Sequence, residues 1–334
     1  MTRTLIVITD HERQHFLPAP LIDELLSLLP AHRIVDPLSL KADDWATLLA
    51  EFRPQLIITG RKTPMLPDDI AIGGDGLRYV CHLAGSVKHL VSDTHLRRGL
   101  LVSNWGNSVS RVMAECGLFL TIAALRRASH WALAMHREGS WKDGNTEFFS
   151  LFERRVGLHG FGAIARELLR LIQPFGVKLQ TWSPSVPEAE LAALGVQRAA
   201  SLEALFDDNE VVIELASLTP RNRGIVDEAM LRRLRPGSVF VNIGRGAVVD
   251  EAAMVRVARE GKVQFALDVF TEEPLPLDSG LRGLSNVTLL PHLAGPTTDR
   301  QRDAGAFALE NIRRHLAGDL PTALIDAEAF ARST

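Results

Sequence analysis

Three residues that can carry charge or a proton each follow a short apolar run typical of a β-strand. Arg245 lies in VFVNIGRGAVVDE, Glu273 in FALDVFTEEP and His292 in VTLLPHLAG. Because ligands bind beyond the carboxyl ends of the strands in an open parallel sheet, three strands would bring a cation, a carboxylate and an imidazole to one site. A fixed cation stabilises negative charge developing on an oxygen, and an imidazole exchanges a proton with it. The three residues are therefore candidates for catalysis.

A glycine-rich turn precedes these residues, between a predicted strand and a predicted helix. In GLHGFGAIA, Gly160 and Gly162 take the first two positions of the G-x-G-x-x-G pattern, and Ala165 takes the third. Gly160 permits a tight turn, Gly162 leaves room for a pyrophosphate, and Ala165 lets the helix pack closely on the strand. A purely structural turn is the alternative, but the flanking strand and helix favour a dinucleotide site. The predicted contacts in this turn are Gly160, Phe161, Gly162, Ala163 and Ile164, whereas His159 is expected to be a loop residue.

Length and composition fit a globular protein of two domains. The chain has 334 residues, of which 46% are hydrophobic and 23% charged. A net charge of -3 gives no field that would gather nucleic acid. Cys81 and Cys116 have no C-x-x-C spacing, so we expect free thiols. The first apolar run, LIVIT, is too short for a secretory signal or a membrane span, which predicts a cytoplasmic protein with neither a nucleic-acid nor a membrane partner.

Strand-like and helix-like segments alternate along almost the whole chain, which predicts an α/β fold with parallel sheets. The first series of strands is TLIVIT, HRIVDP, PQLIITG, LRYVCHL and LLVSNW. The second is RRVGLHG, VKLQTW, EVVIELA, SVFVNIG, VQFALDVF and NVTLLP. Between the two series, the apolar run at 111–137 predicts one long connecting helix. After His292, GPTTDRQRDAGAFALENIRRHLAG predicts a helix that carries the chain back.

Taken together, these motifs resemble the D-isomer-specific 2-hydroxyacid dehydrogenases, most strongly from Val156 to Gly295. The resemblance implies two doubly wound parallel-sheet domains. A Rossmann domain that binds NAD or NADP, at 105–296, would be inserted into a flavodoxin-like substrate domain made of 1–104 and 297–334. It also implies a homodimer that interconverts a small 2-oxo acid and a D-2-hydroxy acid by hydride transfer.

The same resemblance gives each candidate a role. Arg245 would clamp the substrate carboxylate and stabilise charge on the carbonyl oxygen, because its guanidinium is always charged and forked. His292 would be the acid/base, and Glu273 would hold its ring and favour its protonated form. In HLAGSVKHL the family places a substrate loop, where the amides of Gly85 and Ser86 at a helix start would cradle a carboxylate. A plain strand-to-helix turn is the alternative there.

The acid expected after the strand VKLQTW is missing, and Ser183 stands in its place. A serine can hydrogen-bond a ribose, and it does not repel a 2′-phosphate, but no arginine follows closely to grip that phosphate. The choice between NAD and NADP therefore stays open. Ser217, where many members of the family carry proline, affects the cofactor contacts as well. The predicted cofactor contacts outside the glycine turn are Trp182, Ser183, Ser217, Ile243 and Asp268.

Two other classes of protein are alternatives. The run from His11 to His15 matches H-E-x-x-H, the signature of zinc hydrolases. It follows directly after LIVITD, and Pro18 and Pro20 would interrupt the long helix that must present both ligands. We therefore expect a loop here and no metal site. The second alternative is a non-catalytic nucleotide-sensing protein on the same fold, but the three intact catalytic settings favour an enzyme.

Overall fold

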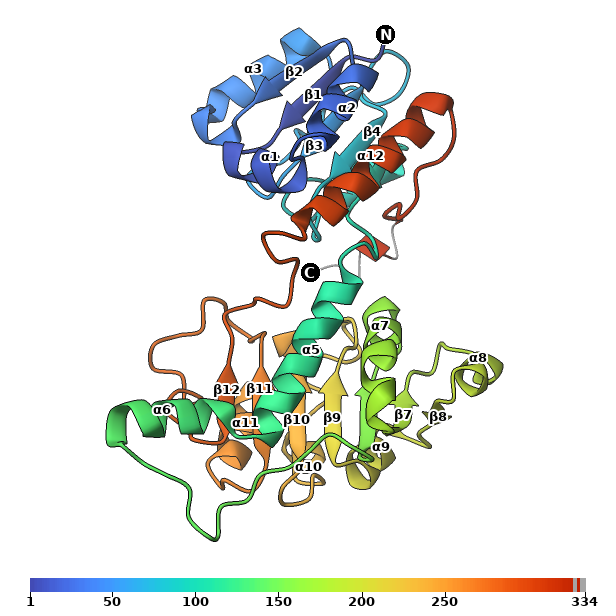
Figure 1. Ribbon diagram of the computed structural model, residues 1–334. Helices are drawn as coiled ribbons and strands as arrows, with labels where there is room; N and C mark the ends of the chain where they lie inside the picture. The colour runs from blue at the N-terminus through green and yellow to red at the C-terminus, as the bar shows by residue number, and fades with distance from the viewer. Residues whose placement is uncertain (327–328, 331–334) are drawn as a thin grey trace. The chain divides into compact units, whose positions relative to one another are not determined.

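The computed structural model describes residues 1–326 and 329–330, the side chains of residues 42 and 43 excepted. The chain divides into two compact units (Figure 1). The first unit consists of Met1–Val109 and Pro296–Thr334, and the second of Ser110–Gly295. Each unit contains one parallel sheet with helices between its strands, which confirms the predicted α/β class. Among the described residues, no helix combines the length and the apolar character needed to cross a bilayer.

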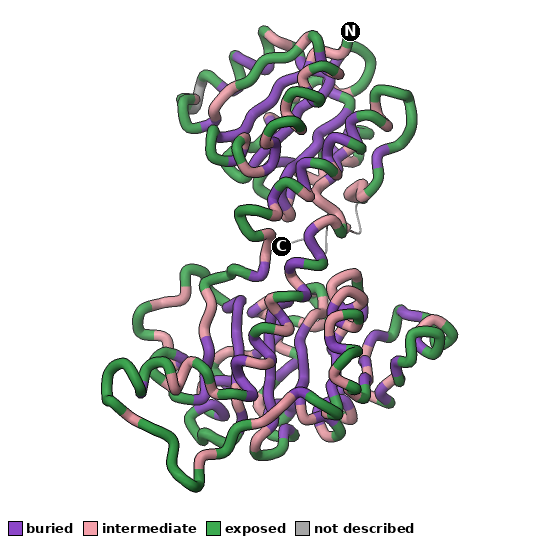
Figure 2. Tube along the Cα trace, viewed as in Figure 1, coloured by how far each residue is buried: buried purple, intermediate pink, exposed green. Residues whose placement is uncertain are grey.

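The first unit is built on five parallel strands in the order β2-β1-β3-β4-β5, the flavodoxin-like arrangement. Every residue of β1, β3 and β4 is buried, which explains why these strands read as apolar runs (Figure 2). The strands are β1 (Thr4–Val7), β2 (His32–Val35), β3 (Leu56–Thr59), β4 (Tyr79–His82) and β5 (Leu101–Ser103). The helices are α1 (Asp10–Phe16), α2 (Leu21–Leu28), η1 (Pro37–Ser39), α3 (Ala42–Phe52), α4 (Asp93–Arg97) and α12 (Gln301–Ala317).

Helix α1 replaces the loop that was expected for the run from His11 to His15, so that expectation is wrong. The Oγ1 of Thr9 accepts the amide of Glu12 at 3.1 Å, and the carboxylate of Glu12 accepts the amide of Thr9 at 3.1 Å. This capping box is encoded by the T-x-x-E spacing that precedes the helix. The helix spans only seven residues and has its C-cap at Leu17, so Pro18 follows the end of the helix.

The second unit contains seven parallel strands in the order β12-β11-β10-β9-β6-β7-β8. The direction of winding reverses between β6 and β9, which is where ligands bind in doubly wound folds. The strands are β6 (Arg155–His159), β7 (Lys178–Trp182), β8 (Gln197–Arg198), β9 (Val211–Glu214), β10 (Val239–Asn242), β11 (Gln264–Leu267) and β12 (Val287–Leu289). Strand β8 is not among the strands predicted from the sequence.

Two apolar cores cover the two faces of this sheet. Helices α5 (Ser110–Leu125) and α7 (Ala163–Ile172) supply one core, and α9 (Leu202–Asp208), α10 (Glu228–Leu231) and α11 (Glu251–Ala258) supply the other. The remaining helices are α6 (Ala128–Glu138), η2 (Gln173–Phe175), α8 (Glu188–Ala193) and η3 (Gly246–Val248).

The run at 111–137 forms two helices rather than the single connecting helix that was expected. Helix α5 ends at Leu125, and α6 begins at Ala128. Between them, Arg127 adopts a left-handed backbone conformation with φ of 52°. The turn changes the direction of the chain, and α6 packs beside β12. The apolar pattern continues through the break, and for that reason the periodicity did not reveal it.

Candidate active site

The glycine turn has the geometry that a dinucleotide requires. Gly160 has a φ of 92°, and a Cβ there would lie 3.0 Å from the backbone of Ala216. Gly162 caps α7, and a Cβ there would meet no atom within 4 Å. The turn therefore leaves open space at the amino end of a ten-residue helix, where amides and the helix dipole favour a pyrophosphate. Ala165 is fully buried against the sheet, as its position in the motif predicts.

Two of the predicted cofactor contacts have side chains that point into the core. Phe161 is buried beneath the guanidinium of Arg166, which lies 5.1 Å from the centre of its ring. Ile243 is also buried, and its Cδ1 lies against Gly117 of α5. Phe161 and Ile243 could therefore contact a ligand through their backbone atoms but not through their side chains.

The loop after β7 is braced by Arg198, which was not among the predicted site residues. Ser183 is buried, and its carbonyl oxygen accepts a hydrogen bond from Nη1 of Arg198 at 2.9 Å. The Nε of the same arginine donates to Glu188 at 2.6 Å. Arg198 belongs to β8, a two-residue strand too short to give a sequence signal. Beside this loop, a cavity of about 380 Å³ is lined by Trp182, Ser201, Leu202, Glu203, Ile225, Asp227, Ala229, Met230 and Arg233.

His292 and Glu273 form a hydrogen-bonded pair. The distance from Nδ1 of His292 to Oε2 of Glu273 is 2.6 Å, and the other oxygen of Glu273 accepts the amide of Phe270 at 2.9 Å. An ionised carboxylate can only accept, so Nδ1 carries the proton that this bond needs. The side chain of His292 is 50% exposed, which leaves its Nε2 side for exchange of a proton with a ligand.

Asp268 fastens the turn that carries His292. Its carboxylate accepts the amides of Leu293 at 2.6 Å and Ala294 at 2.9 Å, and its carbonyl oxygen accepts the amide of His292 at 2.9 Å. Asp268 is fully buried, and burial raises the pKa of its carboxyl group although the two amides oppose that effect. His292 adopts a left-handed conformation with φ of 54°, which these bonds hold in place.

Arg245 lies in the turn that follows β10, next to the turn that carries Glu273. A Cβ on Gly246 would lie 2.0 Å from the carbonyl carbon of Phe270, so only glycine allows the two turns to approach this closely. Burial lowers the pKa of Arg245, and the charge of Glu273 opposes this shift, as two neighbouring opposite charges do. The structure thus brings together Arg245, Glu273 and His292.

Gly85 and Ser86 lie in the first unit, in the loop after β4. The expected helix start is absent, since α4 begins only at Asp93 and residues 88–90 form a turn. The loop is held instead by Asn104, whose Nδ2 donates to the carbonyl oxygen of Gly85 at 2.7 Å. Trp105 packs on Gly85 so closely that a Cβ there would lie 2.8 Å from its ring. The helix-dipole argument for a carboxylate cradle therefore does not apply to this loop.

The histidines and glutamate of the H-E-x-x-H run are arranged differently from a zinc hydrolase site. The carboxylate of Glu12 is buried and accepts the amides of Thr9 and Arg61, the latter at 2.7 Å. Nδ1 of His15 lies 2.7 Å from the carbonyl oxygen of His11. Glu12 thus serves as a capping and bracing residue.

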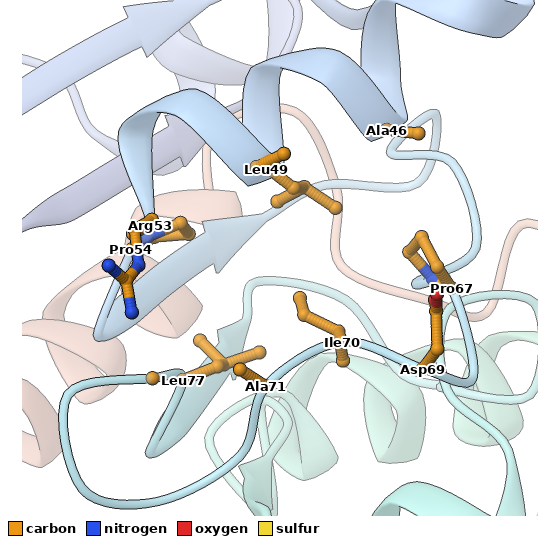
Figure 3. A pocket seen from close by; sticks show the side chains of 11 residues that line it. Ala46, Leu49, Arg53, Pro54, Pro67, Asp69, Ile70, Ala71 and Leu77 are labelled. Atoms are coloured by element: carbon orange, nitrogen blue, oxygen red, sulfur yellow. The ribbon is translucent and has the colours of Figure 1, made fainter.

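A further cavity, of about 370 Å³, lies in the first unit between α3 and the segment 67–77 (Figure 3). Leu49, Ile70 and Leu77 point into it, and Arg53 and Asp69 lie at its ends. Pro54, which precedes β3, places this cavity at the amino ends of the strands. It contains none of the predicted site residues.

Comparison with known proteins defines the class. The family model described as the NAD binding domain of D-isomer specific 2-hydroxyacid dehydrogenases matches residues 118–294, more than half of the chain. The chain therefore belongs to this family, as the sequence motifs predicted.

Individual relatives agree with this assignment. The 4-methyl-2-oxopentanoate reductase A of Aspergillus oryzae is 31% identical over 73% of this chain and 73% of its own length. A D-3-phosphoglycerate dehydrogenase of Mycobacterium leprae is 30% identical over 91% of this chain and 58% of its own length. The chain spans about half the length of the phosphoglycerate dehydrogenases that it matches.

The fold is shared with solved structures. The holo form of D-mandelate dehydrogenase from Rhodotorula graminis superposes with a TM-score of 0.80 at 24% identity, over 97% of this chain and 98% of that one. This similarity confirms the predicted fold class, in which each of two units contains a parallel sheet.

Proposed function

We propose that this protein interconverts a 2-oxo acid and a D-2-hydroxy acid, with NAD or NADP as cofactor. The observation that carries the proposal is the 2.6 Å hydrogen bond between His292 and Glu273, next to Arg245 and in the same unit as the glycine turn. A proton donor, its carboxylate partner and a fixed cation are what reduction of a carbonyl group needs. The matches to named dehydrogenases and reductases support the same reaction class.

The second unit would serve as the cofactor domain that the sequence predicted at 105–296. Gly160 and Gly162 would hold the pyrophosphate at the amino end of α7, in the open space beside Gly162. Trp182, Ser183 and Ser217 would border the adenosine portion. When bound, the nicotinamide supplies the hydride for reduction and accepts it for oxidation.

The protein's own residues would stabilise the negative charge on the carbonyl oxygen and supply the proton. His292, protonated and held by Glu273, would give a proton from Nε2 to the carbonyl oxygen as negative charge develops there. Arg245 would face that oxygen and the substrate carboxylate with its forked N–H donors. Glu273 would accept the hydrogen bond from Nδ1, which fixes the ring and stabilises the positive imidazole. In the reverse direction, neutral His292 would take the proton back.

The first unit would serve as the substrate domain that the sequence predicted at 1–104 and 297–334. Among the described residues, neither the amide of Gly85 nor that of Ser86 donates a hydrogen bond. Two adjacent amides without partners can receive a carboxylate even without a helix start. We therefore propose Gly85 and Ser86 as substrate contacts.

Exposed apolar side chains on and after α6 support a homodimer. Leu133, Met135, Trp141 and Phe148 are each at least 46% exposed, and Trp141 reaches 73%. Met135, Trp141 and Phe148 line a shallow cavity of about 220 Å³. An apolar patch of this kind is typical of a protein–protein contact, which a second copy of the chain would bury.

Two free thiols support a cytoplasmic location. Cys81 and Cys116 form no disulfide, which is usual for proteins of reducing compartments. Burial raises the pKa of Cys81 to about 11 and of Cys116 to about 12, so both thiols stay protonated and unreactive at neutral pH.

Absorbance of the reduced nicotinamide, followed with a panel of 2-oxo acids and with NADH and NADPH, tests the proposal. On the best substrate, His292→Gln should lower turnover by about a hundred- to ten-thousand-fold, as expected for a lost general acid, while NADH binding stays nearly intact. Near-wild-type turnover by this variant would refute the role of His292. Tight NADH binding by the wild type without turnover of any substrate would favour a nucleotide-sensing protein instead.

A further inference from the structure

A buried, hydrogen-bonded pair of ionisable side chains lies directly beneath the glycine turn. His159 and Glu214 are the last residues of β6 and β9 and stand opposite each other in the register of these neighbouring strands. Nδ1 of His159 lies 2.5 Å from Oε2 of Glu214, and the two side chains are 8% and 0% exposed. His159 is therefore a strand residue and not the loop residue that was expected. The pair stands where the winding of the sheet reverses.

Glu214 has a second partner. Its Oε1 accepts the amide of Ala216 at 2.7 Å, so the carboxylate bends the chain back immediately after β9. The amide of Leu215 donates to the carbonyl oxygen of His159 at 2.9 Å, which ties the same segment to β6. One carboxylate thus connects β6 to the segment 214–216 through both of its oxygens.

This segment touches two parts of the candidate site. On one side, Ala216 lies against Gly160, where a Cβ would come within 3.0 Å of its backbone. On the other side, the carbonyl oxygens of Glu214 and Ala216 lie against Gly244, at 3.2 and 3.3 Å from where a Cβ would be. Gly244 directly precedes Arg245 and accepts a hydrogen bond from its Nη1 at 2.8 Å. The segment is therefore in contact with both the nucleotide turn and the turn that carries Arg245.

We propose that His159 and Glu214 are positioning residues that fix the segment 214–216 between the nucleotide turn and the Arg245 turn, and thereby set the affinity for the nicotinamide dinucleotide. The inference rests on the proposed function, because it takes the glycine turn to be a cofactor site. His159 and Glu214 take no part in proton or hydride transfer in the proposed reaction, and their proposed role is to position the backbone of the cofactor site.

Core stability alone is a poor explanation for this pair. Burying a pair of ionisable side chains costs desolvation free energy that offsets much of their attraction, and apolar residues of similar volume are often neutral or stabilising replacements. The strands on either side are apolar, in GLH and VVIE, so leucine would suit both positions. What leucine cannot supply is an oxygen for the amide of Ala216. The placement of the segment is therefore the feature that depends on Glu214.

The paired variant His159→Leu/Glu214→Leu tests this inference by calorimetric titration with NADH, alongside thermal unfolding without cofactor. We expect an unfolding temperature close to that of the wild type and a Kd for NADH raised about five- to twentyfold, the size of one or two lost hydrogen bonds. KM for NADH should rise with Kd, and kcat at saturating NADH should change much less. A folded paired variant that binds NADH as tightly as the wild type would overturn the inference.

Two conservative variants of Glu214 distinguish a role in positioning the segment 214–216 from a general loss of structural stability. Glu214→Gln keeps an oxygen for Ala216 and an N–H donor for His159, so its Kd should stay near that of the wild type. Glu214→Asp is one CH₂ shorter and reaches only one of the two partners, so it should bind NADH more weakly than the glutamine variant. Equal affinities of these two variants would contradict the proposal, and the comparison stands even where the paired variant does not fold.

Asn209→Leu is the matched control. Asn209 is a buried polar residue at the end of α9, just before β9 begins, where it donates to Gln180 at 2.9 Å. Its replacement should lower the unfolding temperature without changing Kd for NADH, and an equal loss of affinity would overturn the inference. Because binding is measured directly, absence of turnover with intact NADH binding rejects the proposed function alone, whereas unchanged binding by the paired variant rejects this inference alone.

Discussion

At the level of single residues, two hydrogen bonds hold His292 in place, one to its backbone and one to its ring. Its amide donates to the carbonyl oxygen of Asp268, and its ring donates from Nδ1 to Glu273. The first bond sets the backbone, and the second sets the orientation of the ring and the atom that carries the proton. These two hydrogen bonds preorganise the proton donor, so that little rearrangement is needed when a substrate binds.

Replacing Glu273 with glutamine should lower turnover less than His292→Gln does. The amide oxygen of glutamine can still accept the hydrogen bond from Nδ1 of His292 and hold the ring, but it brings no negative charge beside the imidazole. Steady-state kinetics of both variants with the best 2-oxo acid measures this difference. A kcat of Glu273→Gln as low as that of His292→Gln would contradict a role limited to holding the ring.

Replacing Arg245 with lysine keeps the charge and removes the planar fork of donors. A single ammonium group cannot pair with a carboxylate through two parallel N–H bonds, so both substrate binding and turnover should suffer. We expect kcat/KM to fall by about tenfold or more, the equivalent of about 1.4 kcal/mol. Steady-state kinetics with the best 2-oxo acid measures this. Retention of full kcat/KM would show that Arg245 acts only as a diffuse positive charge.

At the level of elements, the loop after β7 decides what the adenosine end of the cofactor meets. Arg198 of β8 donates to the backbone of this loop and pairs with Glu188, so its guanidinium braces the loop. Ser183 offers a hydroxyl in place of a carboxylate. We therefore expect the protein to tolerate NADPH as well as NADH.

Ser183→Asp should shift this preference toward NADH. A carboxylate pairs with ribose hydroxyls and repels a 2′-phosphate, so the ratio of kcat/KM for NADH to that for NADPH should rise by about tenfold or more. Ser185→Asp is the control, because Ser185 is an exposed residue of the same loop and adds the same charge nearby. An unchanged ratio in Ser183→Asp would mean that Ser183 does not border the ribose.

At the level of the whole molecule, one buried histidine should make stability depend on pH. His82 ends β4, its Nδ1 lies 2.9 Å from Oγ1 of Thr59, and its Nε2 has no hydrogen-bond partner among the described residues. Burial lowers the pKa of His82 to about 3, with the charges of His89 and Arg61 acting in the same direction. The unfolded chain takes up this proton near pH 6.5, and the folded chain does so only near pH 3.

The free energy of unfolding should therefore fall as the pH drops from about 6.5 toward 3, by up to about 1.4 kcal/mol per pH unit for this one proton. His82→Leu should flatten the profile measured by urea denaturation between pH 7.5 and 4.5. His136→Gln on the exposed face of α6 should leave it unchanged. An identical slope in His82→Leu and the wild type would show that other groups govern the acid sensitivity.

The sequence by itself determined the fold class and the residues at the strand ends. Strands buried on both faces must be apolar, and turns between strand and helix need glycine or polar residues. Both can therefore be predicted from a short stretch of sequence. Arg245, Glu273 and His292 could be identified because each follows the end of such a strand by only a few residues. The family resemblance rested on the same short motifs, and for that reason the fold and the reaction class could be read together.

Hydrophobic periodicity and turn residues did not predict every element correctly. One apolar run became α5 and α6, because apolar spacing continues through a turn. The expected helix after Gly85 was absent, and β8 is too short to leave a pattern.

Only the tertiary structure placed His159 opposite Glu214 and Arg198 beside Ser183, since these contacts join residues 55 and 15 positions apart. The order of strands in the sheet decides which residues meet, and no local pattern along the chain records that order.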